Sequence, residues 1–223
     1  MKYRNFTKAV FLSRPNRFIA TVRMDNGDLE TVHVKNTGRC RELLTKGSKV
    51  YLERSDSPGR STHYDLVSVE KPGKGLFNID SQAPNAAVRE WLDSRDFDLV
   101  RPEFRYGNSR IDFYMERAGE RYLLEVKGCT LERDGMGYFP DAPTERGTKH
   151  LKELTASLKE GFHAGIAFVL QAECFNEVLP NGETDPAFAQ AFREAVSEGV
   201  TVFFCLCSVA PGEIVIREIK KMT

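Results

Sequence analysis

Residues 109–129, SRIDFYMERAGERYLLEVKGC, decide how this chain is interpreted. The stretch consists of two β-rich runs joined by a turn that contains glycine, which is the pattern of a β-hairpin. Three charged residues, Asp112, Glu125 and Lys127, lie within runs that otherwise have the apolar character of a buried sheet. Because a buried charge is costly unless it is paired or binds a ligand, this hairpin is the main candidate for a functional site.

The spacing of these three residues predicts a catalytic centre that binds a metal ion. Side chains of a strand alternate between faces, so Glu125 and Lys127 project to one side and Val126 to the other. Hairpin pairing brings Asp112 close to Glu125, and adjacent carboxylates repel each other unless a proton or cation lies between them. Mg²⁺, or Mn²⁺ in its place, fits this site because Mg²⁺ binds through one or two carboxylates with phosphate and water. With Lys127 orienting water or stabilising charge on a phosphate oxygen, the group suits phosphodiester hydrolysis.

The same charges have a plainer interpretation as a surface salt bridge across a hairpin. The Glu-x-Lys spacing alone is weak evidence, because Glu218 and Lys220 repeat it near the C-terminus. That second copy follows no hairpin with an aspartate, and we expect it on a solvated edge strand. The order of elements around the first copy favours the catalytic interpretation.

The composition indicates a globular protein with a real core, because 41% of the 223 residues are hydrophobic. The five cysteines include no C-x-x-C pair, so neither a disulfide framework nor a zinc site is indicated. No apolar run approaches the roughly 18 residues of a membrane helix. We therefore expect a cytoplasmic chain with no membrane partner. Residues 1–80 carry 15 basic and 9 acidic side chains, and this basic half points to a polyanion.

Two domains are predicted, at residues 1–80 and 81–223. The first has about five short β-rich runs and an Asn26-Gly27 hairpin signal, which fits a small β-barrel of the OB type. The stretch KPGKG at 71–75 marks a change of composition. Beyond it the predicted order is α-β-β-β-α-β and then α-β, so the second domain belongs to the mixed α/β class. Helices are expected at 83–94, 144–161 and 185–199.

Four arginines of the predicted barrel are candidates for nucleic-acid binding. Arg39 and Arg41 follow a tight turn expected at 36–38, and Arg14 and Arg17 flank the RPN loop. Arginines contact phosphate and aromatic rings stack on bases, so such a surface suits a strand of nucleic acid.

The aromatic residues beside these arginines are expected elsewhere. Phe11 and Phe18 are assigned to the barrel core, and DSPGRS at 56–61 is assigned to a loop. The stretch NTGR at 36–39 has a second interpretation, as part of the joint between the two domains.

Residues around the predicted second helix are candidates for supporting roles. Arg146 and Lys149 lie in its first turns, where a helix N-terminus attracts phosphate. The plainer alternative is a simple helix cap, for which Thr144 is suited. Asp141 is either a third carboxylate or a turn residue after Pro140, and the turn is favoured.

Three further charged residues remain open. Glu103 is a candidate for another metal ligand or for a partner of the lysine, and we prefer it slightly to its rival Glu90. Arg110 is a candidate for phosphate contact or for neutralising Asp112.

The hairpin resembles the motif of the PD-(D/E)xK nuclease superfamily. Asp112 matches its acidic position and Glu125-Val126-Lys127 matches its E-x-K, although Arg110-Ile111 stands where the proline would be. A closer similarity covers nearly the whole chain, and it is to the sugar fermentation stimulation protein A family. It is carried by NTGR at 36–39, RYGNSRIDF at 105–113, LLEVKGCTL at 123–131 and YFPDAPTERGTKHLKEL at 138–154.

This resemblance implies an N-terminal OB-like barrel, a nuclease-like C-terminal domain and DNA as the partner. The family name implies a link to the regulation of sugar, particularly maltose, metabolism. Three functions follow as hypotheses: a Mg²⁺-dependent DNA nuclease, a DNA-binding regulator that keeps the nuclease scaffold without turnover, and a nucleotide or oligosaccharide binder. We favour the nuclease, because a scaffold without catalysis has no need to bury so costly a cluster.

Overall fold

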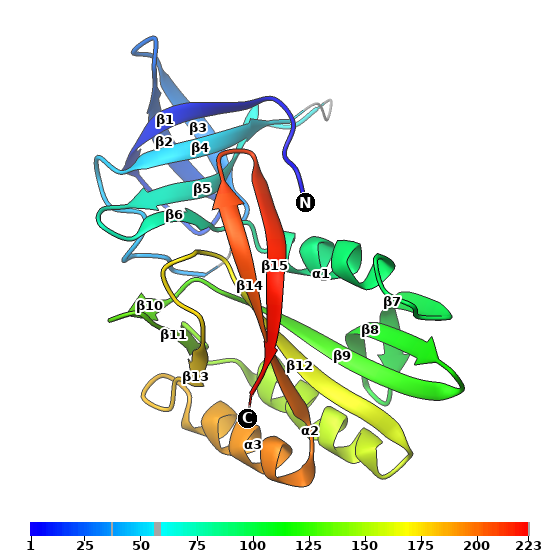
Figure 1. The fold of residues 1–223 in the computed structure, drawn as a ribbon. Helices are drawn as coiled ribbons and strands as arrows, with labels where there is room; N and C mark the ends of the chain where they lie inside the picture. Colours follow the sequence, from blue (N-terminus) through cyan, green and yellow to red (C-terminus); the bar gives the residue numbers. More distant parts are fainter. Residues whose placement is uncertain (37, 56–58, 223) are drawn as a thin grey trace.

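The computed structural model describes residues 1–36, 38–55 and 59–222. Thr37 of the turn expected at 36–38, and residues 56–58 of the loop expected at 56–61, lie outside this part of the chain. The described residues form a small β-barrel and a larger α/β unit, which lie one above the other in Figure 1. Within them, no helix is both long enough and apolar enough to cross a membrane.

The first unit is the predicted OB-type barrel. Its strands pair in the order β3-β2-β1-β4-β5, and a parallel pairing of β3 with β5 closes the ring. The predicted Asn26-Gly27 hairpin is confirmed, with Gly27 at a φ of 91°, where a residue without Cβ is favoured. The strands of this sheet are β1 (Phe6–Ser13), β2 (Ile19–Met24), β3 (Leu29–Val34), β4 (Lys49–Arg54), β5 (Tyr64–Lys71) and β6 (Gly75–Asn78).

The stretch at 71–75, where the composition changes, is a hairpin turn between β5 and β6. β6 pairs antiparallel with β5 and so extends the barrel sheet by one strand. Gly73 and Gly75 have φ angles of 73° and 91°, so the two glycines supply the backbone conformation that this tight turn requires.

The second unit is a six-stranded mixed sheet in the order β15-β14-β12-β9-β8-β7. α1 packs against β9 and β15 on one face, while α2 and α3 pack together on the other. The predicted α-β-β-β-α-β order is confirmed. Its elements are α1 (Ala83–Asp93), β7 (Leu99–Tyr106), β8 (Ser109–Arg117), β9 (Glu120–Cys129), α2 (Glu145–Leu158), β12 (Phe162–Leu170), α3 (Pro186–Glu198), β14 (Thr201–Ala210) and β15 (Glu213–Lys221).

Local signals in the sequence account for the helices on the second face. Thr144 caps α2, because its side chain accepts a hydrogen bond from Gly147 N at 3.0 Å. Leu151 and Leu154, one turn apart on α2, are fully buried against the sheet. Asp185 caps α3 in the same way, by accepting from Phe188 N at 2.9 Å.

A small third sheet was not predicted. It consists of β10 (Glu132–Arg133), β11 (Met136–Phe139) and β13 (Val178–Pro180). These strands have only two to four residues, too few for an alternating pattern to be recognised. Tyr138 and Phe139 belong to β11.

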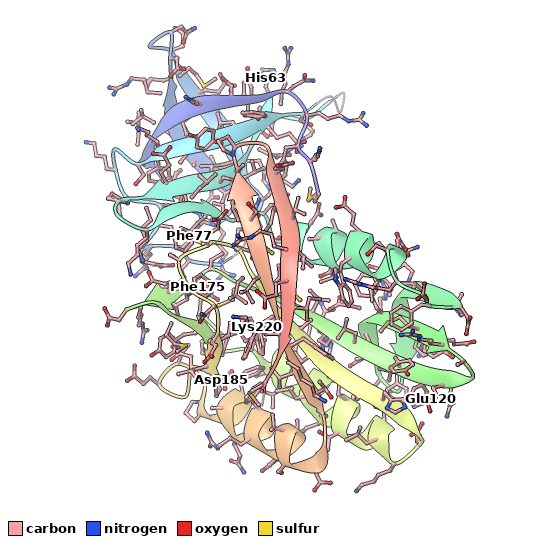
Figure 2. All side chains as sticks on the ribbon, viewed as in Figure 1. His63, Phe77, Glu120, Phe175, Asp185 and Lys220 are labelled. Atoms are coloured by element: carbon pink, nitrogen blue, oxygen red, sulfur yellow. The ribbon has the colours of Figure 1, made fainter. Side chains whose placement is uncertain are left out.

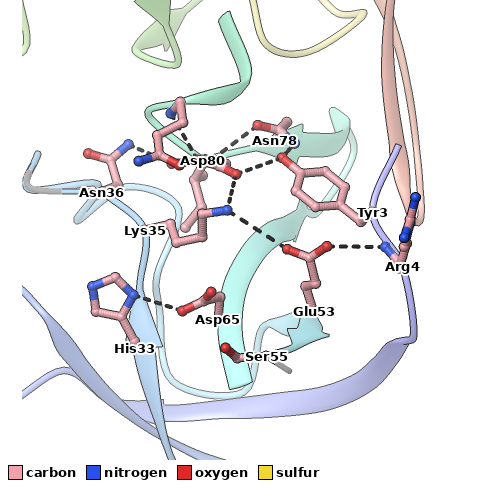
Figure 3. Close-up of polar contacts among 12 residues, drawn as sticks. Tyr3, Arg4, His33, Lys35, Asn36, Glu53, Ser55, Asp65, Asn78 and Asp80 are labelled. Atoms are coloured by element: carbon pink, nitrogen blue, oxygen red, sulfur yellow. Dashed lines mark hydrogen bonds and ion pairs between the residues drawn. The ribbon is translucent and has the colours of Figure 1, made fainter. Parts of the chain in front are cut away.

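The two units meet at a buried polar network, which Figure 3 shows in close-up. Asp80, whose side chain is fully buried, contacts Lys35 Nζ at 2.8 Å and accepts from Tyr3 Oη at 3.1 Å. Gln171, from the end of β12, donates to Asn78 Oδ1 at 3.0 Å and to the carbonyl of Asp80 at 3.1 Å. Because both units contribute to it, this network fixes their relative placement.

Apolar contact supports the same joint. Phe77 of β6 and Phe175, which follows β12, stack with ring centroids 6.5 Å apart, and Figure 2 labels both rings. Asn36 donates to the carbonyl of Ile79 at 2.8 Å, within residues 1–80, and it lines a hollow together with Tyr138 and Gln171 of the second unit. The interpretation of the 36–39 stretch as part of the interdomain joint therefore holds for Asn36.

Replacing the central acid of this network tests its contribution to stability. Asp80→Ala leaves Lys35 as a poorly solvated cation without its closest partner, and we expect the free energy of unfolding to fall by about 3–5 kcal/mol. Urea denaturation followed by circular dichroism measures this change. The control is Asp93→Ala, which removes an exposed ion pair with Arg89 and should cost less than about 1 kcal/mol. Equal small losses in the two variants would contradict a structural role for Asp80.

Candidate functional site

The site begins where β8 separates from β9. The ladder between these strands ends at the pair Phe113 and Leu124, one residue before Asp112 is reached. Beyond that point a side chain takes the place of a backbone acceptor. The Oδ2 atom of Asp112 accepts a hydrogen bond from Val126 N at 2.8 Å. Asn85 of α1 donates to the other oxygen, Oδ1, at 2.7 Å. Asp112 is thus held in place by one backbone and one side-chain donor.

Glu125 is the most deeply buried charge of the site, with 1% of its surface exposed. Lys127 Nζ and His150 Nδ1 both contact its Oε1 atom. As predicted, Lys127 lies on the same face as Glu125, and Val126 packs into the cluster on the α1 face. The second carboxylate oxygen, Oε2, is buried without a hydrogen-bond partner among the described residues.

His150 reaches Glu125 from α2 and is itself 2% exposed. Arg146 Nε donates to His150 Nε2 at 3.4 Å, so this ring nitrogen acts as an acceptor. The proton of a neutral imidazole then lies on Nδ1, which donates it to Glu125. A chain of contacts thus runs from Arg146 through His150 to the buried carboxylate.

The two carboxylates have pKa values shifted in opposite directions. Burial raises the pKa of Asp112, and the neighbouring charge of Glu125 raises it further. Burial also acts to raise the pKa of Glu125, but the hydrogen bond from His150 and the charge of Lys127 outweigh it and lower that pKa. The site therefore contains two close carboxyl groups, and only the charged form of Glu125 is favoured by its partners Lys127 and His150.

The donor set is compatible with a cation of the Mg²⁺ type. In the described residues no group of three or more His, Cys, Asp and Glu side chains is arranged to hold a metal ion. Mg²⁺ does not require such a group, because it keeps several waters and binds through one or two carboxylates plus substrate phosphate. The unpartnered Oε2 of Glu125 supports this fit, since a buried acceptor without a partner is costly.

A cleft of about 690 Å³ opens beside these groups, and we refer to it as the cleft. Two of its basic residues are tied to the protein, since Arg110 pairs with Glu103 at 3.2 Å and Lys149 donates to Asn108 O at 2.7 Å. Asp112 and His150 lie at its wall, so the site opens to solvent through it. Its lining residues are Glu103, Asn108, Ser109, Arg110, Asp112, Glu145, Arg146, Lys149 and His150.

The structure thus gathers most of the proposed supporting residues around Asp112. Glu103, Arg110, Arg146 and Lys149 all line the cleft. Glu103 has an exposed carboxylate that pairs with a cation rather than with Lys127.

Other candidates lie apart from the cleft. Asp141 lines a neighbouring hollow with Asn36 and Tyr138, and Thr144 acts as the helix cap. Glu90, the rival of Glu103, pairs with the amino group of Met1 at 2.5 Å and is not among the residues that line the cleft.

The four barrel arginines do lie together. They line a hollow of about 640 Å³, here called the arginine hollow, that also includes Ala142 and Pro143 from the segment before α2. Arg14 is not free to bind a ligand, because its two terminal nitrogens donate to four backbone carbonyls at 2.6–2.9 Å. Its role is to hold the loop around 36–39. The exposed members are Arg17, Arg39 and Arg41.

One aromatic assignment is wrong. Phe11 lies in the barrel core as expected, with 3% of its surface exposed, but Phe18 is 53% exposed. Phe18 lies just before β2, on the loop that follows β1, where its side chain has no neighbouring strand to cover it.

Two partners of the site could not be recognised in the sequence. Asn85 lies 27 residues before Asp112, and His150 lies 25 residues after Glu125, with no fixed spacing to connect them. His150 lies with Arg146 and Lys149 in the first turns of the predicted second helix, which made it a minor candidate, but no spacing linked it to Glu125.

Comparison with known proteins shows matches along both units. A family model described as SfsA N-terminal OB domain matches residues 12–78, and one described as sugar fermentation stimulation protein RE domain matches residues 82–213. Curated proteins named sugar fermentation stimulation protein homolog, from Ruminiclostridium cellulolyticum and Clostridium perfringens, are 46% and 48% identical. These two alignments cover 98% and 96% of this chain, and 97% and 96% of the relatives.

One solved structure is similar over nearly the full length. It is the structure of Pyrococcus furiosus SfsA in complex with Ca²⁺, with a TM-score of 0.84 and 28% identity, covering 98% of this chain and 96% of that chain. The predicted fold class, an OB-like barrel followed by a restriction-endonuclease-like α/β domain, is therefore confirmed.

The raised pKa of Asp112 predicts how stability depends on pH. A carboxyl whose pKa is higher in the folded state stabilises the fold below its unfolded pKa of about 3.9, and this contribution is lost as pH rises through the folded pKa. Asp112→Asn removes the charge and can keep both hydrogen bonds if the Asn85 amide turns over. In metal-free buffer, Asp112→Asn should therefore melt higher than the native protein at pH 7–8. The difference in melting temperature between the variant and the native protein should disappear near pH 3, where Asp112 is protonated in both the folded and the unfolded chain.

Thermal melting across this pH range is the measurement, with EDTA in every sample. A variant that melts lower than the native protein at pH 7–8 and keeps that difference in acid would show that Asp112 is a structural carboxylate.

Proposed function

The chain belongs to the sugar fermentation stimulation protein A family, and from its site we propose a divalent-metal-dependent nuclease that hydrolyses phosphodiester bonds of DNA. The observation that carries this proposal is the buried Glu125 carboxylate. One of its oxygens is held by Lys127 and His150, and the other has no partner among the described residues. Beside it lies Asp112, whose pKa is raised by burial and by the charge of Glu125. A cation between the two would relieve both penalties.

Asp112 and Glu125 are the residues that would hold Mg²⁺ or Mn²⁺. When bound, such an ion acts as a Lewis acid on a phosphoryl oxygen and lowers the pKa of bound water. The solved structure of the Pyrococcus furiosus relative is a complex with Ca²⁺. Like Mg²⁺, Ca²⁺ is a hard cation that takes oxygen ligands, so this complex supports a divalent ion in the family.

The remaining residues position the reaction. His150 and Lys127 fix the Oε1 atom of Glu125, so its second oxygen keeps one orientation. The ammonium of Lys127, with its side chain 16% exposed, can orient water or stabilise charge that develops on a phosphate oxygen. Arg146 and Lys149 line the cleft, where they can contact the phosphates on either side of the reacting one.

DNA is the proposed substrate because basic groups continue from the cleft onto the barrel. Pro143 lines the arginine hollow and Glu145 lines the cleft. These residues are two positions apart, so their Cα atoms are separated by at most about 7 Å. One polyanion can therefore contact both hollows. We expect binding through the phosphate backbone, with little sequence specificity.

The second candidate is a DNA-binding regulator of sugar metabolism that does not cleave. The family name favours it, since it describes an effect on sugar fermentation. The buried cluster of Glu125, Lys127 and His150 favours the nuclease, because a protein that binds only the backbone gains nothing from burying these groups. Cleavage by the purified protein distinguishes the two.

Substitution of the three central residues tests the nuclease. Asp112→Ala and Glu125→Ala should each abolish Mg²⁺-dependent cleavage, and Lys127→Ala should slow it about 10²- to 10³-fold while DNA affinity is retained. Single-stranded, double-stranded and flapped DNA are incubated with Mg²⁺ or Mn²⁺ and resolved on gels.

The matched control is Lys220→Ala, in the second Glu-x-Lys copy on the edge strand β15 (Figure 2 labels Lys220), because Lys220 is not among the residues that line the cleft. This variant should cleave as the native protein does. If the native protein binds DNA but cuts none of the substrates, the regulator replaces the nuclease.

The arginine hollow generates a separate prediction for affinity. Arg39→Ala or Arg41→Ala should weaken DNA binding and reduce the slope of log affinity against log salt by about 1 each, because each removes one phosphate contact. Fluorescence anisotropy over a salt series measures the slope. Arg23→Ala, an exposed arginine on β2, is the control and should leave the slope unchanged. Unchanged slopes in all three variants would exclude the hollow as the DNA path.

A further inference from the structure

A second hollow on the barrel lies on the face between the loop after β1 and the loop after β4. Its volume is about 570 Å³, and we call it the barrel-face hollow. Its lining includes Arg4, Phe18, His33, Arg54, Arg60 and Asp65. None of these residues belongs to the cleft or to the arginine hollow.

The ring at the rim of this hollow is exposed but firmly placed. Phe18 is 53% exposed, although a phenylalanine is normally buried. Its backbone is fixed on both sides, because Phe18 N donates to Asn16 Oδ1 at 2.9 Å and Phe18 O accepts from Val34 N at 2.7 Å. A flat apolar face is thus presented to solvent on an ordered backbone, which limits the entropy lost when something stacks on it.

The floor of the hollow is a rigid ionic cluster. Asp65, only 7% exposed, accepts from both terminal nitrogens of Arg60 at 3.0 and 2.5 Å and contacts His33 Nδ1 at 2.8 Å. Figure 3 shows His33 and Asp65 facing each other there. The guanidinium of Arg60 offsets the charge of Asp65, and the other carboxylate of the lining, Glu53, lies 3.8 Å from Lys35 Nζ.

Unpaired positive charge stands around this floor. Among the described residues, the guanidinium groups of Arg4 and Arg54 have no hydrogen-bond or ion-pair partner. Guanidinium groups bind phosphate through paired N–H donors. An exposed aromatic ring beside free guanidinium groups is the combination by which proteins bind unpaired nucleotides, with the base on the ring and the phosphate on the arginine.

The hollow also lies in line with the proposed substrate path. Arg17, the residue before Phe18, lines the arginine hollow, so adjacent side chains connect the two hollows. Pro143 and Glu145 connect the arginine hollow to the cleft in the same way. Neighbouring residues of the chain therefore connect the barrel-face hollow to the arginine hollow, and the arginine hollow to the cleft.

We propose that Phe18, with Arg4 and Arg54, forms a base-stacking subsite for single-stranded nucleic acid. The inference rests on the proposed function and narrows its substrate to strands with unpaired bases. In a duplex each base is covered by its neighbours and is not available to an external ring, whereas a single strand presents its bases freely. The barrel then anchors the strand, and the arginine hollow guides it toward the cleft.

Binding to two strands that differ only in their bases tests this subsite. A fluorescent oligothymidylate and an abasic strand of equal length are titrated with the full chain in EDTA, so that no cleavage occurs. The native protein should bind the oligothymidylate more tightly. In Phe18→Ala the ratio of the two affinities should fall about five- to 150-fold, the contribution of one base stacked on an aromatic ring.

Two further variants separate stacking from other effects. Phe18→Trp should restore the ratio, because it keeps an aromatic face. Leu29→Ala removes a similarly exposed apolar side chain, 66% exposed at the start of β3, and should leave the ratio at the native value.

The outcomes distinguish this inference from the proposed function. A native protein that binds both strands equally, or a Phe18→Ala variant that keeps the native ratio, would overturn the stacking subsite while backbone binding stands. A native protein that binds neither strand and no duplex would overturn the proposed function as well.

Discussion

The cost of burying the Glu125 carboxylate governs the arrangement of the site. An ion moved into the interior loses several kcal/mol of hydration, and this is recovered only by partners with good geometry. Here the partners come from two elements, Lys127 on the same strand and His150 on the helix that covers it. β9 lies inside the sheet, between β8 and β12, and α2 lies over it. The strand itself and this helix therefore both supply partners for the charge.

The same constraint explains why β8 leaves β9 where it does. If the ladder continued, the backbone of β8 would bond to Val126 N. Instead the Asp112 side chain accepts this hydrogen bond, so the strand ends its pairing without leaving a buried donor unsatisfied. The divergence opens the cleft and places a second carboxylate at its wall. The joint at Asp80 then fixes the barrel so that its arginines face the segment leading into α2.

Local patterns in the sequence predicted most of the fold, because strand alternation, turn glycines and helix caps act over a few residues. They also predicted that Glu125 and Lys127 share a face. They did not predict that His150 and Asn85 complete the site, since these contacts span 25 and 27 residues and depend on how α1 and α2 pack. Phe18 was misplaced for a related reason. Its apolar character favours burial, and only the closed barrel shows that no strand covers the loop before β2.

The second Glu-x-Lys copy shows that spacing alone does not make a site. Glu218 and Lys220 lie on β15, which in the described sheet pairs only with β14 along its length and ends that sheet. Glu218 is exposed, so water solvates its charge, and no buried histidine or second carboxylate is needed. On β9 the same two residue types are largely removed from water, Lys127 and His150 contact one oxygen of Glu125 and lower its pKa, and Asp112 lies beside it. The chemistry proposed here therefore comes from the central position of the strand.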